Sequence, residues 1–468
     1  MDIINQAAAK PVKPQQVAVP CFTPYEAYQD SGVEWLGEIP VGWGVVKLSH
    51  VYKCIGSGAT PSSDEGKWYV GKVPWVTTGE LREQLIIKTK KCVSDSSFIK
   101  YPALKKYPKG SIVIAMYGAT IGRLGILGVS ASTNQACCVI SDSKNVFNKY
   151  LFFCLQGFRE NIISLASGGG QPNINRDKVA SLRIPYPPLP QQQTIATYLD
   201  QKTKQLDHAI ALKQQQIKLL KEYQEIMIAN AVTKGLDPDA LMQDSGVEWL
   251  GEIPVGWGKL NCRYIINQLT DYTANGSFAD LAKNVHYTDI PSYSRLIRLT
   301  DFRSCFLNNG VYVSKKAHLF LRKSELKGGE FLIANVGAYA GLANIMPKLP
   351  YKCTLAPNMF KVILNVNLIT TRFAFFLINC QFYWEYMQSI SASSAQPKLN
   401  KENIRSLPVI LPPLPEQKAI ATYLDQKTTE IKKAINLHTE QIAKLKEYKT
   451  VLINNAVTGK IKITPSML

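Results

Sequence analysis

Two long segments of the chain place apolar side chains in a narrow stripe with the alternating three- and four-residue spacing of a heptad seam. The first segment follows Pro187, Pro188 and Pro190, and residues 191–232 contain no Gly or Pro, so a long helix is predicted there. The second segment repeats this pattern near the C-terminus. The seam residues are Leu199, Leu206, Ile210, Ile217, Leu220 and Met227 in the first helix and Leu424, Ile431, Ile435, Ile442, Leu445 and Leu452 in the second.

The two stripes match position for position, which favours packing of one helix against the other. We expect an antiparallel coiled coil, since this pairing would place the two variable parts of the chain at opposite ends of a rod. Lys213, His438, Gln224 and Lys449 interrupt the seam and help to set the pairing. In the competing arrangement each helix packs only on its own neighbouring domain.

An internal repeat sets the organisation of the chain. The segment Asp30–Gly44 returns unchanged as Asp244–Gly258, and Pro187–Thr203 returns with few changes as Pro412–Thr428. The blocks between these repeats differ, apart from a few isolated residues. Ala115, Gly118 and Gly122 match Ala334, Gly337 and Gly341, and Asn134 is expected to match Asn358. A duplicated scaffold around dissimilar blocks indicates one shared mechanical role and two different recognition roles.

The order of repeats predicts an α+β protein with internal pseudo-two-fold symmetry, in which two mixed α/β domains are separated by the two long helices. Short apolar runs predict strands at 75–76, 111–115 and 136–140, and at 296–299, 331–334 and 359–364. Helices are predicted at 150–167 and 371–390. The predicted segments are a loose arm (1–24), a first domain with its box 30–44 (25–185), a helix and linker (186–240), a second domain with its box 244–258 (241–410), and a helix and tail (411–468).

Composition narrows the class of protein. The chain is 46% hydrophobic and 19% charged, which is typical of a globular protein, and no apolar run approaches the roughly 18 residues that span a bilayer. The first 24 residues lack the apolar core of a secretory signal. Ten scattered cysteines without a Cys-x-x-Cys pair fit a reducing cytoplasm, and five isolated histidines have no ligand spacing. We therefore expect a cytoplasmic protein without a membrane segment or a metal site.

The formal net charge of +19 comes from two regions. Residues 45–185 carry 19 Lys and Arg against 8 Asp and Glu, and residues 259–410 carry 18 against 8. Two basic domains joined by nearly neutral helices indicate two sites on one extended polyanion, and double-stranded DNA is the simplest such ligand.

Loops rich in small polar, aromatic and basic residues supply the candidate DNA contacts. Arg and Lys meet phosphates or guanine edges, and Asn and Gln can pair with adenine, although Gly and Ser loops are also ordinary turns. The candidates in the first domain are Thr60, Ser62, Ser63, Lys67, Trp68, Tyr69, Thr77, Thr78, Arg82, Tyr117, Arg123, Gln171 and Asn173. Those in the second are Arg298, Thr300, Arg303, Asn335, Tyr339, Ser394, Gln396 and Lys398.

The box DSGVEWLGEIP, the PPLP run into the YLDQKT helix and the two variable blocks resemble the specificity subunit of a type I restriction-modification enzyme. The resemblance covers about residues 25–459. It implies two target recognition domains that each read half of a split, asymmetric DNA site. It also implies two methyltransferase (modification) subunits that bind S-adenosylmethionine, and motor-nuclease (restriction) subunits that use ATP and magnesium. Base-reading residues are not fixed in this family, so none is carried over.

The chain itself lacks the motifs of those partner activities. It has no Asn-Pro-Pro-Tyr or Asp-Pro-Pro-Tyr motif for adenine methylation and no G-x-x-x-x-G-K-[ST] loop for ATP. We expect no catalytic residues and no cofactor bound by this chain. Two hypotheses remain: a non-catalytic specificity subunit inside a restriction assembly, and a stand-alone tandem-domain DNA-binding regulator. A nuclease with an unrecognised site is a poorer third.

Overall fold

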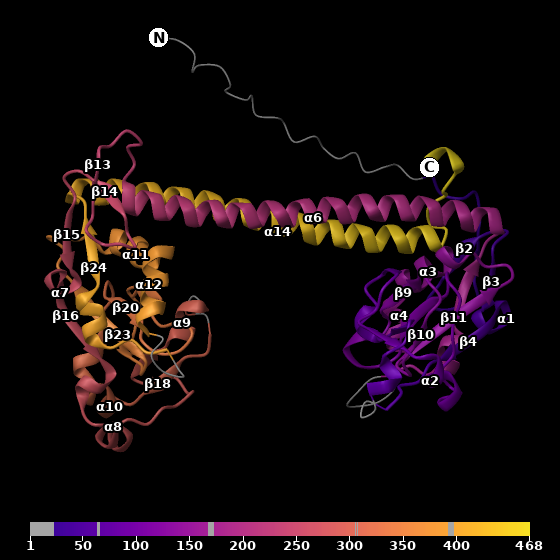
Figure 1. Ribbon diagram of the computed structural model, residues 1–468, viewed down its shortest axis with the longest axis horizontal. Helices are drawn as coiled ribbons and strands as arrows, with labels where there is room; N and C mark the ends of the chain where they lie inside the picture. Colours follow the sequence, from indigo (N-terminus) through magenta and orange to yellow (C-terminus); the bar gives the residue numbers. More distant parts are fainter. Residues whose placement is uncertain (1–22, 63–65, 167–172, 305, 307, 392–396) are drawn as a thin grey trace, which may run out of the picture. The chain divides into compact units, whose positions relative to one another are not determined.

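The computed structural model describes residues 23–468 except 63–65, 167–172, 305, 307 and 392–396 (Figure 1). The chain divides into two units. Unit 1 contains residues 1–212 and 440–468, and unit 2 contains residues 213–439. Each unit therefore combines one mixed α/β domain with half of each long helix.

Unit 1 is built on a five-stranded sheet in the order β4-β11-β8-β9-β6 and a three-stranded sheet in the order β10-β5-β7. The strands of the larger sheet are β4 (Tyr52–Ser57), β6 (Gln84–Ile86), β8 (Ile112–Ala115), β9 (Leu124–Leu127) and β11 (Cys137–Ser143). The smaller sheet contains β5 (Val73–Val76), β7 (Lys91–Val93) and β10 (Ser132–Thr133). Short pairs join β1 (Tyr28–Asp30) to β2 (Glu38–Pro40) and β3 (Gly44–Lys47) to β12 (Arg183–Tyr186). The helices of this domain are α1 (Leu48–Val51), α2 (Asp95–Lys100), α3 (Asn148–Gly157), α4 (Arg159–Ser164) and α5 (Arg176–Ser181).

Unit 2 contains two four-stranded sheets, in the orders β16-β23-β20-β21 and β18-β17-β22-β19. The first contains β16 (Ile266–Asp271), β20 (Phe331–Ala334), β21 (Ala343–Ile345) and β23 (Met359–Leu364). The second contains β17 (Ser294–Ile297), β18 (Val311–Val313), β19 (Glu325–Leu326) and β22 (Lys352–Leu355). The pairs are β13 (Met242–Asp244) with β14 (Glu252–Pro254) and β15 (Gly258–Asn261) with β24 (Pro408–Leu411). The helices are α7 (Cys262–Ile265), α8 (Phe278–Asn284), α9 (Leu299–Arg303), α10 (Lys315–Phe320), α11 (Thr371–Asn379), α12 (Gln381–Ser391) and α13 (Lys401–Ser406).

Each predicted strand lies on or overlaps an observed one, but two predicted helices are each divided in two. The helix expected at 150–167 breaks after Gly157, and the helix expected at 371–390 breaks at Cys380. Both breaks let a second short helix turn so that its own apolar residues, such as Ile162 and Met387, stay buried. The apolar content of these segments gave no sign of the change in direction.

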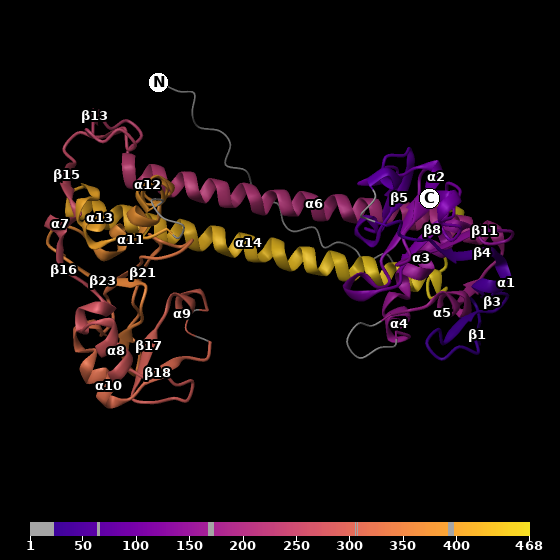
Figure 2. The same cartoon turned by 60° about the horizontal axis from the view of Figure 1, so that its bottom comes forward.

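The long helices are α6 (Leu189–Lys234) and α14 (Leu414–Val457). They lie side by side (Figures 1 and 2), and all twelve predicted seam residues are buried or half-buried. The first helix begins before the predicted boundary, with Pro190 in its first turn, where a backbone N–H has no intrahelical partner to lose.

The pairing of α6 with α14 is antiparallel in each unit. In unit 1 Leu199 shares a core with Leu452, and the Lys449 Nζ lies 2.6 Å from Asp207 Oδ1, so residue numbers rise on one helix as they fall on the other. In unit 2 Met227 shares a core with Leu424. The predicted antiparallel coiled coil is confirmed. The beginning of each helix also packs on its own domain, because Tyr150 and Phe373 belong to these same two cores.

The duplicated box holds the point where one long helix begins and the other ends. In unit 1 the Trp43 Nε1–H donates to Gln191 Oε1 at 3.1 Å, and in unit 2 the Trp257 Nε1–H donates to Glu416 Oε2 at 3.1 Å. The Tyr28 hydroxyl of unit 1 also donates to the carbonyl of Gly459, just after α14. The shared mechanical role expected for the two copies of the repeat is therefore to hold the two long helices together at a junction.

At this junction a continuous stretch of chain joins a long helix to the box in unit 2, but not in unit 1. In unit 2 the chain leaves α6 through Gly235 and leads into the box, whereas in unit 1 the described chain begins at residue 23, shortly before the box. The Lys462 N–H donates to the Thr23 carbonyl at 3.0 Å, so the two ends of the described chain meet where unit 2 has a covalent connection. The shared parts of the two units, which are the box, the domain and the two half-helices, thus follow one another in circularly permuted order along the chain.

Candidate nucleic-acid interface

Each domain carries a glycine turn of the same hydrogen-bonded form after a central strand. The Gly122 N–H donates to the Ala115 carbonyl at 3.0 Å, and the Gly341 N–H donates to the Ala334 carbonyl at 2.7 Å. Both glycines have left-handed φ values, 75° and 98°, which side chains with a Cβ rarely adopt. The structure therefore confirms that Ala115 and Gly122 match Ala334 and Gly341.

A second segment crosses each glycine turn at an equivalent place. Tyr117 forms a β-bridge with Asn173 in unit 1, and Val336 forms one with Lys398 in unit 2. The predicted contact residues Asn173 and Lys398 therefore hold the same position in the two domains, with an amide in one and a cation in the other.

The expected match of Asn134 with Asn358 is wrong. The Asn134 N–H donates to the last residue of β5, and Ala356 makes the same bond to the last residue of β17. Asn358 instead takes the place of Ala136, because the carbonyl of each accepts from the residue that follows the central strand β20 or β8. The two blocks differ in loop length, which a sequence match of isolated residues did not reveal.

The loops that follow β5 and β17 are also equivalent, and a carboxylate holds each of them. The Thr77 N–H donates to Glu80 Oε2 at 2.8 Å, and the Arg298 N–H donates to Asp301 Oδ2 at 2.7 Å. In each loop the carboxylate of the third helical residue accepts from the backbone N–H of the residue that precedes the short helix, which is one of the two bonds of a capping box. The predicted contact residues Thr77 and Arg298 therefore occupy one structural position with different chemistry.

Four of the predicted residues of unit 2 line two adjoining clefts of about 630 and 560 Å³, which together we call the unit 2 cleft. Arg298 and Thr300 lie in one part, and Asn335 and Lys398 lie in the other. The two parts share the walls made by Tyr287, Val336, Pro357, Asn358 and Met359. The cleft therefore brings together donors and acceptors from segments that are up to about a hundred residues apart in sequence.

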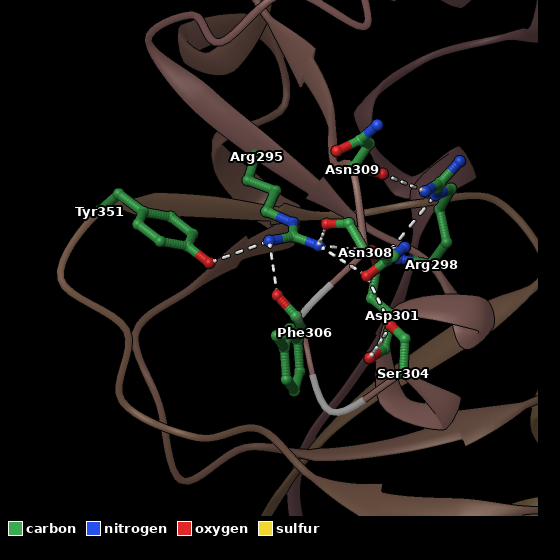
Figure 3. Close-up of polar contacts among 8 residues, drawn as sticks. All are labelled: Arg295, Arg298, Asp301, Ser304, Phe306, Asn308, Asn309 and Tyr351. Carbon is green, nitrogen blue, oxygen red and sulfur yellow. Dashed lines mark hydrogen bonds and ion pairs between the residues drawn. The ribbon is translucent and has the colours of Figure 1, made fainter.

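A buried ionic network fixes the wall of this cleft (Figure 3). Asp301 is fully buried, and its Oδ1 accepts from Arg295 Nη2 at 2.7 Å and from Asn308 Nδ2 at 2.9 Å. The Arg295 Nη1 also donates to the Tyr351 hydroxyl at 3.1 Å. Burial alone raises the pKa of Asp301, but the hydrogen bonds from Arg295, Arg298 and Asn308 outweigh it, so the pKa lies below its ordinary value. Asp301 is therefore ionised and balanced by the buried Arg295.

In unit 1 two of the three predicted aromatic residues, Trp68 and Tyr69, are built into the fold. Trp68 is buried against Tyr101, and the Tyr69 hydroxyl donates to the Pro61 carbonyl at 2.7 Å. The Lys67 Nζ lies 4.8 Å from the centre of the Trp68 ring. Trp68 thus stabilises its loop in this structure rather than presenting a stacking surface.

The remaining predicted residues differ in how they are placed. The exposed or half-buried ones are Thr60, Ser62, Lys67, Thr78, Arg82, Tyr117, Arg123, Thr300 and Tyr339. Ser63, Gln171, Ser394 and Gln396 lie outside the described residues, as does the side chain of Arg303.

Comparison with known proteins identifies the family. Residues 40–222 and 278–444, more than half of the chain, match the type I restriction modification DNA specificity domain. The chain belongs to the family of type I restriction specificity subunits. The resemblance read from the repeats is thereby confirmed.

Relatives of this specificity subunit span almost its whole length. It is 23% identical to the type I restriction enzyme MjaVIII specificity subunit of Methanocaldococcus jannaschii, over 91% of this chain and 94% of the relative. It is 26% identical to the StySPI specificity subunit of Salmonella potsdam, over 92% and 89% of the two chains.

Solved structures share the fold. A chain from work on complex assembly and conformational transition of the type I R-M system has a TM-score of 0.68 at 15% identity, over 90% of this chain and 99% of the other. The HsdS subunit from Thermoanaerobacter tengcongensis has a TM-score of 0.52 at 16% identity, over 90% and 98% of the two chains. The two-domain architecture with long helices is therefore that of this family.

Sequence reasoning missed the two carboxylates, Glu80 and Asp301, that hold the equivalent loops of this specificity subunit. The spacing Thr77-x-x-Glu80 is a readable capping-box signature, and Asp301 stands at the same spacing from Arg298. Among the residues that the structure describes, no three His, Cys, Asp or Glu side chains gather as a metal site, and no helix is long and apolar enough to cross a membrane.

Proposed function

We propose that this chain is the DNA-recognition subunit of a type I restriction-modification complex and that each of its two domains reads one half of a bipartite, asymmetric site in double-stranded DNA. The observation that carries the proposal is the pairing of equivalent loops with different side chains. Thr77 and Asn173 in unit 1 stand where Arg298 and Lys398 stand in unit 2. One scaffold that presents two different sets of donors and acceptors suits two different half-sites.

The net positive charge of both domains supports this function. Phosphates of the duplex attract the basic blocks without regard to sequence. This part of the affinity falls as the salt concentration rises, because the counterions that binding releases from DNA then gain less entropy. Base edges in the groove then discriminate between sites. We expect the isolated chain to bind DNA in a salt-sensitive manner.

The long helices offer surfaces for two copies of one partner. Exposed apolar side chains that gather on one part of a surface mark protein interfaces, whereas scattered ones are normal. Each unit exposes a leucine, a tyrosine and a β-branched residue at positions that the repeat relates to those of the other unit. These are Leu212, Tyr448 and Val451 in unit 1 and Leu437, Tyr223 and Ile226 in unit 2. We infer that each set receives one methyltransferase subunit.

The proposal assigns the chemistry to the partners. S-adenosylmethionine would bind to the methyltransferase subunits, and ATP and magnesium to the motor-nuclease subunits, while this chain directs them to cytoplasmic DNA. The purified chain alone is expected neither to methylate nor to cleave DNA. Methyl transfer by the chain alone at the rate of the complete complex would contradict this assignment.

A domain exchange tests the proposal. Residues 45–185 are replaced by the corresponding block of a related subunit, and the methylated motif of cells that carry the complete system is determined by methylome sequencing. One half of the motif should change while the other stays intact. A change in both halves, or in neither, would refute independent reading. Purification with stoichiometric partner subunits would exclude a stand-alone regulator.

A further inference from the structure

The side chain of Arg298 is held in one orientation at the edge of the unit 2 cleft. Its backbone N–H and its Nε both bond to Asp301 Oδ2, at 2.7 and 3.3 Å, and its Nη2 donates to the Asn309 carbonyl at 3.3 Å (Figure 3). The Arg298 side chain is 35% exposed, whereas Asp301 is fully buried. A buried carboxylate thus orients a guanidinium that still reaches the cleft.

The charge of Arg298 is not needed to neutralise Asp301. Arg295 is itself buried, and its 2.7 Å ion pair with Asp301 already balances the carboxylate. The cluster of two arginines and one aspartate therefore keeps a net positive charge, and the exposed part of that charge lies on Arg298. Among the described residues, the Arg298 Nη1 has no hydrogen-bond partner, so it remains available to a ligand.

We propose that Arg298 is a specificity-determining residue that reads a guanine in the half-site recognised by unit 2, and that Asp301 is its positioning residue. This inference rests on the proposed function. Guanine presents two adjacent acceptors, O6 and N7, in the major groove, and the fork of a guanidinium matches them. The bonds to Asp301 and Asn309 use the Nε–H and one N–H of Nη2, which leaves both N–H groups of Nη1 and the second N–H of Nη2 for this contact.

The equivalent position in unit 1 indicates whether Arg298 contacts a base or a phosphate. Phosphates carry the same charge at both half-sites, so a position that contacts phosphate is expected to hold a cation in both units. Unit 1 instead has Thr77, whose short side chain bonds to Glu80 Oε2 at 2.5 Å. The scaffold is retained and the cation is not, which is the pattern of a position that reads different bases.

The test compares three variants in the complete system, in cells without other adenine methylation. R298A removes the side chain, R298K keeps the charge but loses the fork, and R322A removes an exposed arginine outside the cleft as a control. Methylome sequencing should show that R298A and R298K relax one base pair in one half of the motif, by about 5- to 150-fold in discrimination. The other half, and the R322A motif, should stay as in the wild type.

Other outcomes overturn the inference. An unchanged motif with equally weaker methylation at all sites, and DNA affinity that depends less steeply on salt, would identify Arg298 as a phosphate contact. An unchanged motif at full rate would show that Arg298 has no contact. If a variant methylates nothing, binding of the purified complex to duplexes altered at single positions replaces the methylome, and uniform loss overturns the proposal. A wild-type motif that is not bipartite would refute the proposed function itself.

Discussion

The buried pair of Arg295 and Asp301 predicts a large and local effect of the isosteric change D301N. Every neighbour of the Asp301 carboxylate is a donor: Arg295 Nη2 and Asn308 Nδ2 at Oδ1, and the Arg298 backbone and Nε at Oδ2. Whichever way the asparagine turns, its NH₂ group faces donors, and Arg295 loses its counter-charge. Leaving one member of a buried ion pair without its partner costs about 3–5 kcal/mol.

The equivalent carboxylate of unit 1 provides the matched control. Glu80 bonds to the loop after β5 but has no arginine partner among the described residues, and the glutamine of E80Q keeps a carbonyl oxygen that can accept from the Thr77 N–H, so E80Q should cost no more than about 1 kcal/mol. Unit 2 contains 227 residues, for which 1 kcal/mol corresponds to about 2–4 °C in melting temperature. We expect D301N to lower the melting temperature of unit 2 by roughly 6–20 °C, and E80Q to lower that of unit 1 by no more than about 2–4 °C.

Hydrogen exchange followed by mass spectrometry measures the two units separately. Peptides from β17 to β18 should lose protection in D301N, and unit 1 peptides should not. Because the pKa of folded Asp301 is lowered, its contribution is complete above about pH 4 and is lost only as the pH falls through the folded pKa. The difference between wild type and D301N should therefore persist from pH 8 to pH 5. A D301N effect no larger than that of E80Q would refute the account of Arg295 as a charge that depends on Asp301.

Three further predictions concern the scaffold. I226E or V451E, each on one exposed helix face, should reduce the number of bound methyltransferase subunits from two to one in native mass spectrometry, while I99E on the surface of unit 1 should leave two. G459A should destabilise the α14 junction more than G42A, because a Cβ at Gly459 would lie 2.4 Å from Pro40 whereas one at Gly42 meets nothing, and both have φ of +75° or more; comparison of their melting temperatures checks this. A chain opened in the linker after α6, with residue 468 joined to residue 23, should keep the wild-type methylated motif, because Lys462 and Thr23 already meet in unit 1.

The sequence alone determined the parts of this protein that depend on local pattern. The seam of α6 and α14 could be read because helical periodicity repeats every few residues, and the duplicated box because an exact repeat of this length cannot arise by chance. The glycine turns were also visible, since a left-handed φ at Gly122 and Gly341 restricts the residue type. Charge by region then indicated a nucleic-acid ligand.

Only the tertiary structure decided which residues share a site. Arg295 meets Tyr351 across 56 residues, and Val336 meets Lys398 across 62, through contacts that no local pattern encodes. The burial of Trp68 and the break at Cys380 likewise depend on what packs against these residues. The equivalence of Thr77 with Arg298 emerged from hydrogen bonds of the backbone, which the fold preserves after the side chains have diverged. Side chains that face a ligand are free to differ between the two domains, so their positions can be compared only through the scaffold that holds them.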